Sequence, residues 1–193
     1  MGKIYCIMGK SSSGKDSIYK MLLEDEQLSL AKIIPYTTRP MREGERDGVE
    51  YYFCSEERLA ELERAGRIIE LRAYDTVCGI WKYFTVNDHQ ICKEERDCLM
   101  ITTLAAYRKL DAYFGDGRVV PVYVEVEDGE RLQRALDRER SQKLPNYEEL
   151  CRRFLADARD FSEEELKAAG ITRRFVNRKL IETVQNIKNF MLE

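Results

Sequence analysis

Short apolar runs alternate with stretches of helical periodicity along most of this chain. The runs at 3–8, 98–101 and 119–124 are almost continuously apolar, so they predict strands buried on both faces. Pro121 cannot donate a ladder hydrogen bond, which argues against a central position for 119–124. Further extended segments are expected at 33–36, 51–53, 67–73, 82–86 and 171–176.

Helical spacing and cap residues predict the segments between these strands. Residues 75–81 are instead expected to turn around Gly79, and Asn177 is expected to cap the last helix. Strands that alternate with helices indicate an α/β fold with a parallel sheet, covered on both sides, whose ligands bind at the carboxyl ends of its strands. The expected helices are 17–28, 55–64, 87–95, 104–114, 128–140, 147–161, 162–169 and a last one with Leu180, Ile181, Val184, Ile187 and Met191 on one face.

A glycine-rich loop with a lysine follows the first apolar run and precedes the first helix. Strand, loop and helix in this order are typical of a P-loop, whose backbone N–H groups, helix dipole and lysine hold phosphates. A flexible Ser/Gly turn is the alternative, but the flanking elements favour phosphate binding. Asp16 stands where a P-loop usually has the Ser or Thr that ligates Mg²⁺, and Ser17 follows one residue late. The loop residues are Gly9, Lys10, Ser11, Ser12, Ser13, Gly14, Lys15 and Asp16.

Composition narrows the function classes. The 193 residues suit one domain with a substantial core, and 32 Lys and Arg against 35 Asp and Glu give a net charge of −3, which argues against general nucleic-acid binding. The N-terminus runs straight into a core strand and no apolar run approaches a membrane span, so we expect neither signal peptide nor membrane anchor. Six cysteines without a Cys-x-x-Cys pair predict no metal cluster and no disulfide framework, as in a reducing cytoplasm.

Other polar positions are candidates for binding, and most of them also allow a structural interpretation. Arg39 and Arg42, followed by Tyr51, could clamp a second phosphate, although composition alone slightly favours a solvated linker. Glu70 lies in an apolar stretch, where a carboxylate needs a partner. The helices at 128–140 and 147–161 are rich in arginine, which is typical either of a salt-bridged solvated face or of a phosphate-binding surface.

The chain resembles the guanylate kinase family over nearly its whole length. Residues 37–44 and 51–53 are similar to the family's T-T-R-x-P-R-x-G-E…Y-x-F segment, which binds the monophosphate. Arg67-Ile68-Ile69-Glu70 resembles the strand that carries the family's guanine-reading glutamate, and Val77-Cys78-Gly79 falls where the family has Tyr-Tyr-Gly. The resemblance implies a three-layer P-loop NTPase-type fold with a parallel sheet, a small mixed monophosphate-binding insertion and a helical lid.

The same resemblance implies roles for individual residues. Glu70 would accept hydrogen bonds from guanine, with Gly79 nearby, and Asn177 would lie near ATP. The expected ATP site consists of residues 9–17 with Asn177. The whole chain, 1–193, is expected to form one domain. Its core would be about 1–34, 97–126 and 170–193, its monophosphate region about 35–96 and its lid about 127–169. The expected catalytic residues are Lys15, Asp16, Arg39, Arg134, Arg138 and Arg153, and the expected clamp on the acceptor phosphate is Arg39, Arg42 and Tyr51.

Several positions depart from the family pattern. Pro35 and Ile80 replace hydroxyl residues that read guanine O6, and Cys78 replaces a tyrosine. The family strand that ends in Asp-x-Asp reads Ile101-Thr102-Thr103 here, so two carboxylates are missing. We therefore hypothesise that Asp16 takes over part of the Mg²⁺ role.

These observations predict a cytoplasmic kinase that transfers phosphate from ATP to GMP with Mg²⁺, as a monomer or a homodimer. Two alternatives stay open: a kinase for a different monophosphate, and a nucleotide-binding module with little catalysis. The chain keeps Gly9, Gly14 and Lys15 while the base-reading residues change, a pattern that favours retained use of ATP.

Overall fold

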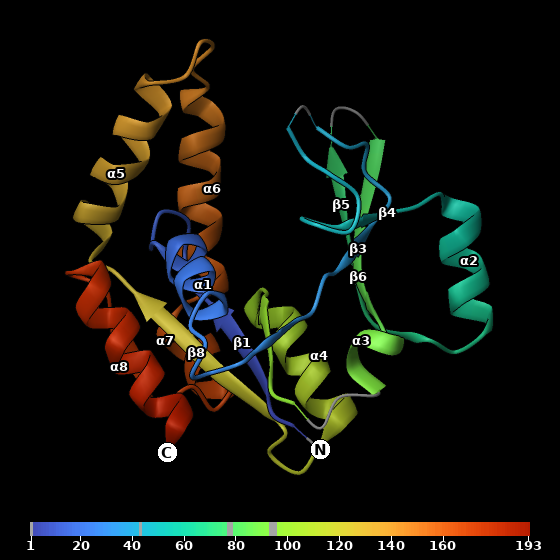
Figure 1. Ribbon diagram of the computed structural model, residues 1–193. Helices are drawn as coiled ribbons and strands as arrows, with labels where there is room; N and C mark the ends of the chain where they lie inside the picture. The colour runs from blue at the N-terminus through green and yellow to red at the C-terminus, as the bar shows by residue number, and fades with distance from the viewer. Residues whose placement is uncertain (1, 43, 77–78, 93–95) are drawn as a thin grey trace.

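The computed structural model of the protein describes residues 2–42, 44–76, 79–92 and 96–193. Two sheets organise these residues, with helices around them (Figure 1). The larger sheet has five strands in the order β2-β7-β1-β8-β9, and every pairing in it is parallel. Its strands are β1 (Ile4–Met8), β2 (Ala31–Lys32), β7 (Cys98–Ile101), β8 (Val119–Glu125) and β9 (Arg174–Val176). The predicted α/β fold with a parallel sheet is confirmed.

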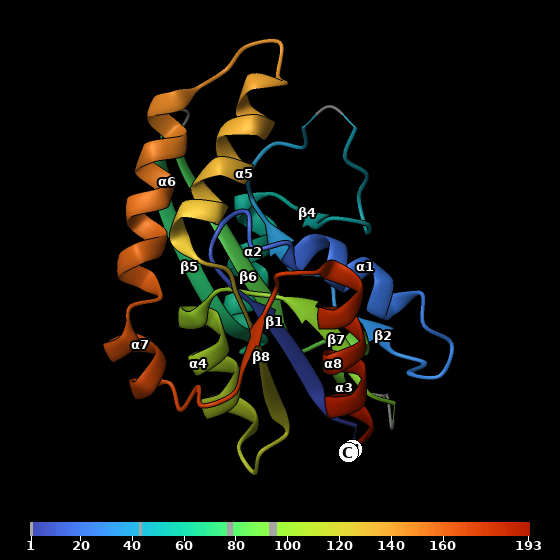
Figure 2. The same ribbon diagram turned by 90° about the vertical axis from the view of Figure 1, so that its left-hand side faces the viewer.

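Both faces of the parallel sheet are covered, which explains why β1 is apolar throughout. Successive side chains of a strand point to opposite faces, and here Ile4 and Cys6 belong to one core cluster whereas Tyr5 and Ile7 belong to the other. The helices of these layers are α1 (Lys15–Leu23), α4 (Leu104–Phe114), α7 (Glu163–Ala168) and α8 (Leu180–Leu192), and Figure 2 shows them around the sheet.

The second sheet is mixed and has four strands in the order β4-β3-β6-β5. A long hairpin of β5 (Ile68–Thr76) and β6 (Gly79–Val86) forms most of it, β3 (Tyr36–Thr37) pairs with β6, and β4 (Tyr52–Phe53) pairs with β3 at the edge. Leu59 and Leu62 of α2 (Glu56–Arg64) pack with Phe84 and Val86 in a small separate core. A short helix, α3 (His89–Cys92), follows.

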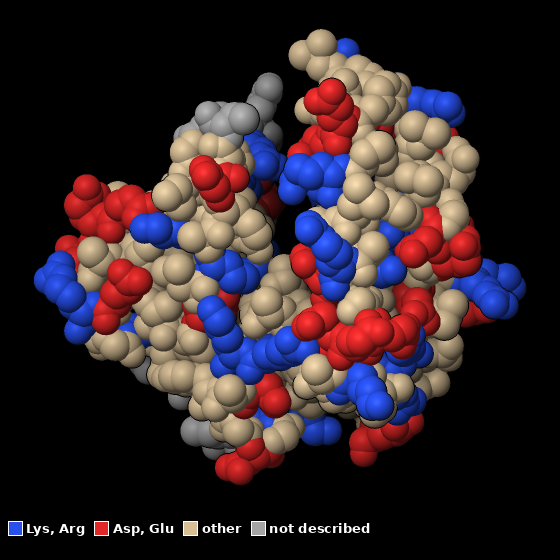
Figure 3. Space-filling view, turned by 180° about the vertical axis from the view of Figure 1, so that it is seen from behind, with Lys and Arg blue, Asp and Glu red and all other residues tan. Residues whose placement is uncertain are grey.

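Two long helices, α5 (Asp128–Arg140) and α6 (Tyr147–Asp160), form an arm that rises from the parallel sheet (Figure 1). The mixed sheet forms a second arm opposite it. A space-filling view shows the molecule hollowed between the two arms, with Lys and Arg side chains gathered around the hollow (Figure 3). Among the helices of the described ranges, none is long and apolar enough to cross a membrane.

Local rules placed many element ends correctly. Helices 104–114 and 128–140 match their predicted bounds, and α2 begins after Ser55, whose side chain accepts a hydrogen bond from the Arg58 N–H at 3.3 Å. Ser162 caps α7 in the same way through the Glu165 N–H at 3.3 Å. Cys6 and Cys98 are buried, as their apolar surroundings predict.

The position predicted for Pro121 was wrong. Strand β8 lies inside the sheet, between β1 and β9, and Pro121 pairs with Cys6. Strand β9, however, pairs with β8 only from Tyr123 onward. Among the described pairings, Pro121 therefore has a neighbouring strand on one side only, where a missing N–H is tolerated.

Several predicted bounds were also wrong at their ends. Helix α1 begins at Lys15 rather than 17 and ends at Leu23 rather than 28, because the chain turns after it and Ser29 has a φ of 45°. The expected turn at 75–81 is mostly strand, since β5 and β6 pair through Thr76 and Gly79. Strand β9 covers only the second half of 171–176, and residues 33–35 link the two sheets between β2 and β3.

Two predicted caps were wrong as well. The last helix begins at Leu180 after Lys179 without a side-chain cap, and Ile181 is 66% exposed rather than on the buried face. The helix expected at 87–95 is α3, where the Gln90 N–H donates to Asp88 rather than to Asn87. The rest of that segment, 93–95, lies outside the described residues.

Candidate functional site

The glycine-rich loop connects the carboxyl end of β1 to α1, and its glycines are required by close contacts. A Cβ on Gly9 would lie 2.4 Å from the Val124 carbonyl oxygen. Gly14 has a φ of +85°, and a Cβ there would lie 2.4 Å from Nδ2 of Asn177. Both positions therefore accept only glycine, and the backbone turns tightly as a phosphate-binding loop requires.

Asn177 fixes this loop from the other end of the chain. Its side chain is buried, and Nδ2 donates to the Ser13 carbonyl at 2.8 Å. Thr183 on α8 donates through Oγ1 to Oδ1 of Asn177 at 3.3 Å, which orients the amide. Asn177 thus supports the loop that is predicted to hold ATP, instead of capping α8.

Lys15 opens α1 and faces the loop among charged neighbours. Burial lowers the pKa of its ammonium group below the ordinary value. The carboxylates of Asp16 and Asp157 oppose this lowering of the pKa. The guanidinium groups of Arg153 and Arg138 add to it, so both arginines lie near Lys15. The structure therefore brings together three of the predicted catalytic cations.

A network of charged residues joins the α5–α6 arm to the loop. Asp157 on α6 accepts a hydrogen bond from the Ser11 backbone N–H at 2.7 Å. Arg131 on α5 is 1% exposed and contacts Asp157 at 3.3 Å and Asp128 at 2.9 Å. Asp128 also pairs with Lys10 at 3.2 Å. The base of this arm is thus bonded to the predicted ATP site.

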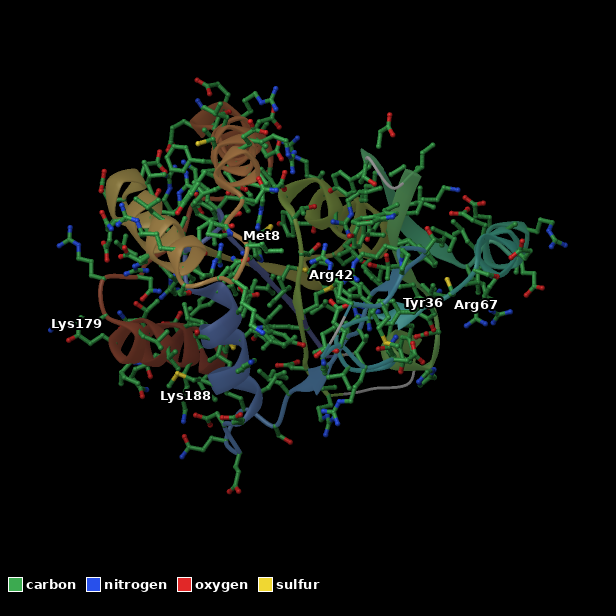
Figure 4. The ribbon with its side chains drawn as sticks, turned by 90° about the horizontal axis from the view of Figure 1, so that it is seen from above. Met8, Tyr36, Arg42, Arg67, Lys179 and Lys188 are labelled. Carbon is green, nitrogen blue, oxygen red and sulfur yellow. The ribbon has the colours of Figure 1, made fainter. Side chains whose placement is uncertain are left out.

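Other arginines of the arm reach the same site. Arg153 donates to the Ser11 hydroxyl at 3.1 Å, and Arg134 donates to the Asn177 carbonyl at 3.3 Å. Arg138 lines a cavity of about 280 Å³ between α5 and α6, to which Arg42 of the opposite arm also contributes. Figure 4 places Arg42 between the α5–α6 arm and the mixed sheet that carries Tyr36.

Arg39 is the centre of the predicted phosphate clamp, and the structure pairs it internally. It is 4% exposed, and its two terminal nitrogens contact the Glu45 carboxylate at 2.8 and 2.6 Å. The Arg39 hydrogen bond lowers the pKa of Glu45 to about 2. The Tyr51 ring lies 5.1 Å from the Arg39 guanidinium, whereas the exposed Arg42 lies 6.0 Å from the Trp81 ring. The structure therefore groups Arg39 with Tyr51, whereas Arg42 lines the cavity.

Glu70 has the internal partner that its burial requires. Its side chain is fully buried, and Arg72 contacts both carboxylate oxygens, through Nε at 2.9 Å and Nη2 at 3.2 Å. Thr85 donates to Oε1 at 2.9 Å. Gly79 begins β6 with a φ of +104°, and Ile80 beside it is 60% exposed. Cys78 lies outside the described residues.

Two threonines follow β7 in the segment where the resemblance would place carboxylates. Thr103 caps α4 and accepts a hydrogen bond from Arg72 at 3.2 Å, while Thr102 has a buried hydroxyl without a partner among the described residues. Within the ranges that the structure describes, no group of three or more His, Cys, Asp or Glu residues could hold a metal ion. Asp16 and Ser17 are exposed on the first turn of α1, where a carboxylate can ligate Mg²⁺ together with substrate phosphates.

Arg72, Arg131 and Asp157 are the site residues that sequence reasoning missed. Arg131 was recognised only as one arginine of a basic helix. The one available signal for Arg72 is its place two residues after Glu70, on the same face of one strand. For Asp157 no local signal exists, because its contact with Ser11 joins residues 146 positions apart.

Known proteins with similar sequences and structures share one description. The family model described as "Guanylate kinase" matches residues 1–192. A guanylate kinase from Porphyromonas gingivalis is 27% identical over 191 residues, covering 97% of this chain and 95% of the relative. One from Malacoplasma penetrans is 28% identical over 195 residues, covering 99% and 84%. The crystal structure of guanylate kinase from Anaplasma phagocytophilum has the same fold, with a TM-score of 0.69 at 21% identity, covering 99% of this chain and 85% of that one.

Proposed function

The chain belongs to the guanylate kinase family, and on that premise we propose that it transfers the terminal phosphoryl group of ATP to a nucleoside monophosphate, with GMP as the favoured acceptor. The observation that carries this proposal is the position of Lys15. It lies at a glycine loop that follows the carboxyl end of β1, and Arg153 of the α5–α6 arm donates to the Ser11 hydroxyl of the same loop at 3.1 Å. The opposite arm carries Arg39 and Tyr51 in contact.

Phosphoryl transfer needs positioning and charge neutralisation more than covalent chemistry from the protein. An oxygen of the acceptor phosphate attacks the terminal phosphorus of ATP, the bond to the bridging oxygen breaks, and ADP leaves. The loop N–H groups and Lys15 hold the phosphates of ATP, while Arg39, Arg42 and Tyr51 hold the acceptor phosphate. The charge that develops between them is neutralised by the arm residues Arg134, Arg138 and Arg153.

One internal ion pair and one internal hydrogen bond occupy groups that the substrate phosphates would use. Arg39 is paired with Glu45, so an acceptor phosphate has to share or replace that carboxylate. Asp157 occupies the Ser11 N–H, so phosphates that use this donor displace the carboxylate. Movement of the α5–α6 arm over the hollow would exclude water, which protects ATP from hydrolysis.

Asp16 and Ser17 would hold Mg²⁺, which when bound neutralises charge on the outer phosphates of ATP. Asp16 lies next to Lys15 and is exposed, so its carboxylate is available to a metal that enters with the nucleotide. This arrangement supplies one carboxylate at the loop in place of the two that are missing after β7.

The working parts of the domain follow from the two sheets. We assign the core to about 1–34, 97–126 and 170–193, the monophosphate region to about 35–96, and the lid to about 127–169. The separate mixed sheet supports the second region, and the α5–α6 arm supports the third. The net charge of −3 and the free, buried Cys6 support a cytoplasmic protein that does not bind nucleic acid, and it would act as a monomer or a homodimer.

Release of ADP from ATP and Mg²⁺, measured with GMP, dGMP, AMP, UMP or CMP as acceptor, tests the proposal. We expect stimulation by GMP to exceed that by the pyrimidine nucleotides. Stronger stimulation by another nucleotide would keep the kinase and replace the acceptor. Nucleotide binding without stimulation by any acceptor would contradict the proposed activity.

Substitution of Asp16 by alanine tests the metal assignment. Because a metal ligand acts on the charge of the transition state, we expect turnover at a fixed Mg²⁺ concentration to fall about 10²-fold. The melting temperature should not change, since Asp16 is exposed. Steady-state rates across a Mg²⁺ titration measure the effect, and Glu24→Ala at the exposed end of α1 is the matched control. Unchanged turnover and an unchanged Mg²⁺ dependence in Asp16→Ala would contradict the assignment.

A further inference from the structure

The Glu70 carboxylate is occupied by a side chain of its own strand. Arg72 approaches it with two parallel N–H groups, Nε to Oε2 at 2.9 Å and Nη2 to Oε1 at 3.2 Å. This two-point contact is the strongest geometry that an arginine and a carboxylate form. It uses both oxygens at once, and the Glu70 side chain has no exposure to solvent.

The donors of Arg72 match those of a guanine edge in kind and in spacing. Guanine presents N1–H and one N2–H side by side, joined through a single carbon, and the guanidinium group presents Nε–H and Nη2–H in the same way. A guanine that is read by Glu70 needs the same two oxygens. Oε1 also accepts the Thr85 hydroxyl at 2.9 Å, which leaves little acceptor capacity for a third donor.

A second contact holds Arg72 in this position. Its Nη1 donates to the Thr103 hydroxyl at 3.2 Å, and Thr103 is itself fixed as the cap of α4. Arg72 therefore bridges β5 of the mixed sheet and the end of β7 in the parallel sheet. Displacing its guanidinium would leave a largely buried cation without its carboxylate, which is costly.

We propose that Arg72 is a specificity-determining residue that occupies Glu70 in place of a guanine edge, so that the protein selects weakly for guanine among nucleoside monophosphates. This inference rests on the proposed function, in which Glu70 is the base-reading carboxylate. Pro35 and Ile80 act in the same direction, because neither side chain can donate a hydrogen bond to guanine O6. The acceptor is then bound chiefly through its phosphate and sugar.

Binding of GMP and of IMP, which lacks the N2 amine, tests the proposal in the native protein. If Arg72 holds Glu70, the amine is not read, and calorimetry should give dissociation constants for GMP and IMP within about threefold. In Arg72→Ala, we expect GMP to bind about tenfold more tightly than in the native protein, and the preference for GMP over IMP to rise by a similar factor. Arg72→Lys keeps the charge without the fork and should lie between the two.

Arg58→Ala is the matched control, since it removes an exposed arginine whose carboxylate partner, Glu61, is also exposed. It should change neither dissociation constant. A native preference for GMP of tenfold or more, or weaker GMP binding in Arg72→Ala, would overturn the proposal; the second result would mean that Arg72 itself contacts the base. If Arg72→Ala fails to fold, the native comparison and Arg72→Lys still decide.

The calorimetric readout keeps this inference separate from the proposed activity. Binding ratios that follow the expectation, without acceptor-stimulated release of ADP, would contradict the kinase activity and support the role of Arg72. Release of ADP with a native preference for GMP of tenfold or more would support the kinase and contradict that role. Absence of GMP binding in both the native protein and Arg72→Ala would overturn the inference, because Glu70 would not be a guanine site.

Discussion

Replacing Lys15 with methionine should lower kcat about 10³-fold, which is the largest effect on turnover that we expect from one side chain. The ammonium group lies at the glycine loop near Arg138 and Arg153, and in the proposed mechanism it neutralises charge as phosphate is transferred. Methionine keeps most of the volume of the lysine and removes only the charge. Steady-state rates of ADP release, with GMP as acceptor, measure the change.

Lys20→Met provides the control for this experiment. Lys20 lies in the last turn of the same helix and is exposed, so its replacement should leave kcat and the melting temperature close to native values. Lys15→Met should also melt near the native temperature, because removing a desolvated charge does not disturb the core. Native turnover in Lys15→Met would mean that the loop is not the ATP site.

Arg131→Ala should reduce the free energy of unfolding by about 3 kcal/mol. Its guanidinium is 1% exposed and is shared between Asp157 at 3.3 Å and Asp128 at 2.9 Å. The Phe154 ring also packs on it, with the centroid 4.0 Å from the guanidinium carbon. Its removal leaves Asp157 without its direct ion-pair partner and opens a gap between α5 and α6. For a chain of this length the melting temperature should fall by about 6–12 °C.

Arg140→Ala on the same helix is the comparison. Arg140 is exposed and lies 3.9 Å from Asp137, and an exposed pair of this kind contributes less than about 1 kcal/mol. Thermal melting of the two variants side by side separates a buried charge network from surface charges. Equal stabilities for both variants would show that the contacts of Arg131 contribute nothing to the fold.

The parts of the structure that were predictable from the sequence depend on local rules. The P-loop was recognised because Gly9, Gly14 and Lys15 lie within one loop, and the loop conformation requires those glycines for reasons of backbone geometry. The caps at Ser55 and Ser162 were recognised for the same reason, since a cap and its helix are neighbours in sequence.

The parts that were missed depend on partners far away along the chain. Asn177 was expected to cap α8, but its amide bonds to Ser13, which no local rule connects to it. Arg131 was recognised only as one arginine of a basic helix, because helical spacing does not reveal which face α6 covers. Pro121 argued against a central position for its strand, and the short extent of β9 explains how it is accommodated.

The order of strands in the parallel sheet has a consequence for how the chain folds as it is synthesised. Strand β1 carries the glycine loop, yet it pairs with β7, which begins at Cys98, and with β8, which begins at Val119. The hairpin of β5 and β6, by contrast, is closed by residues that are close in sequence, and loop closure is easier for such contacts. On the ribosome the mixed sheet can therefore assemble first, while both apolar faces of β1 stay uncovered until the strands that follow are synthesised. The monophosphate region would serve as an early-folding unit, and the ATP site would form last, when the segment from β9 to α8 arrives with Asn177.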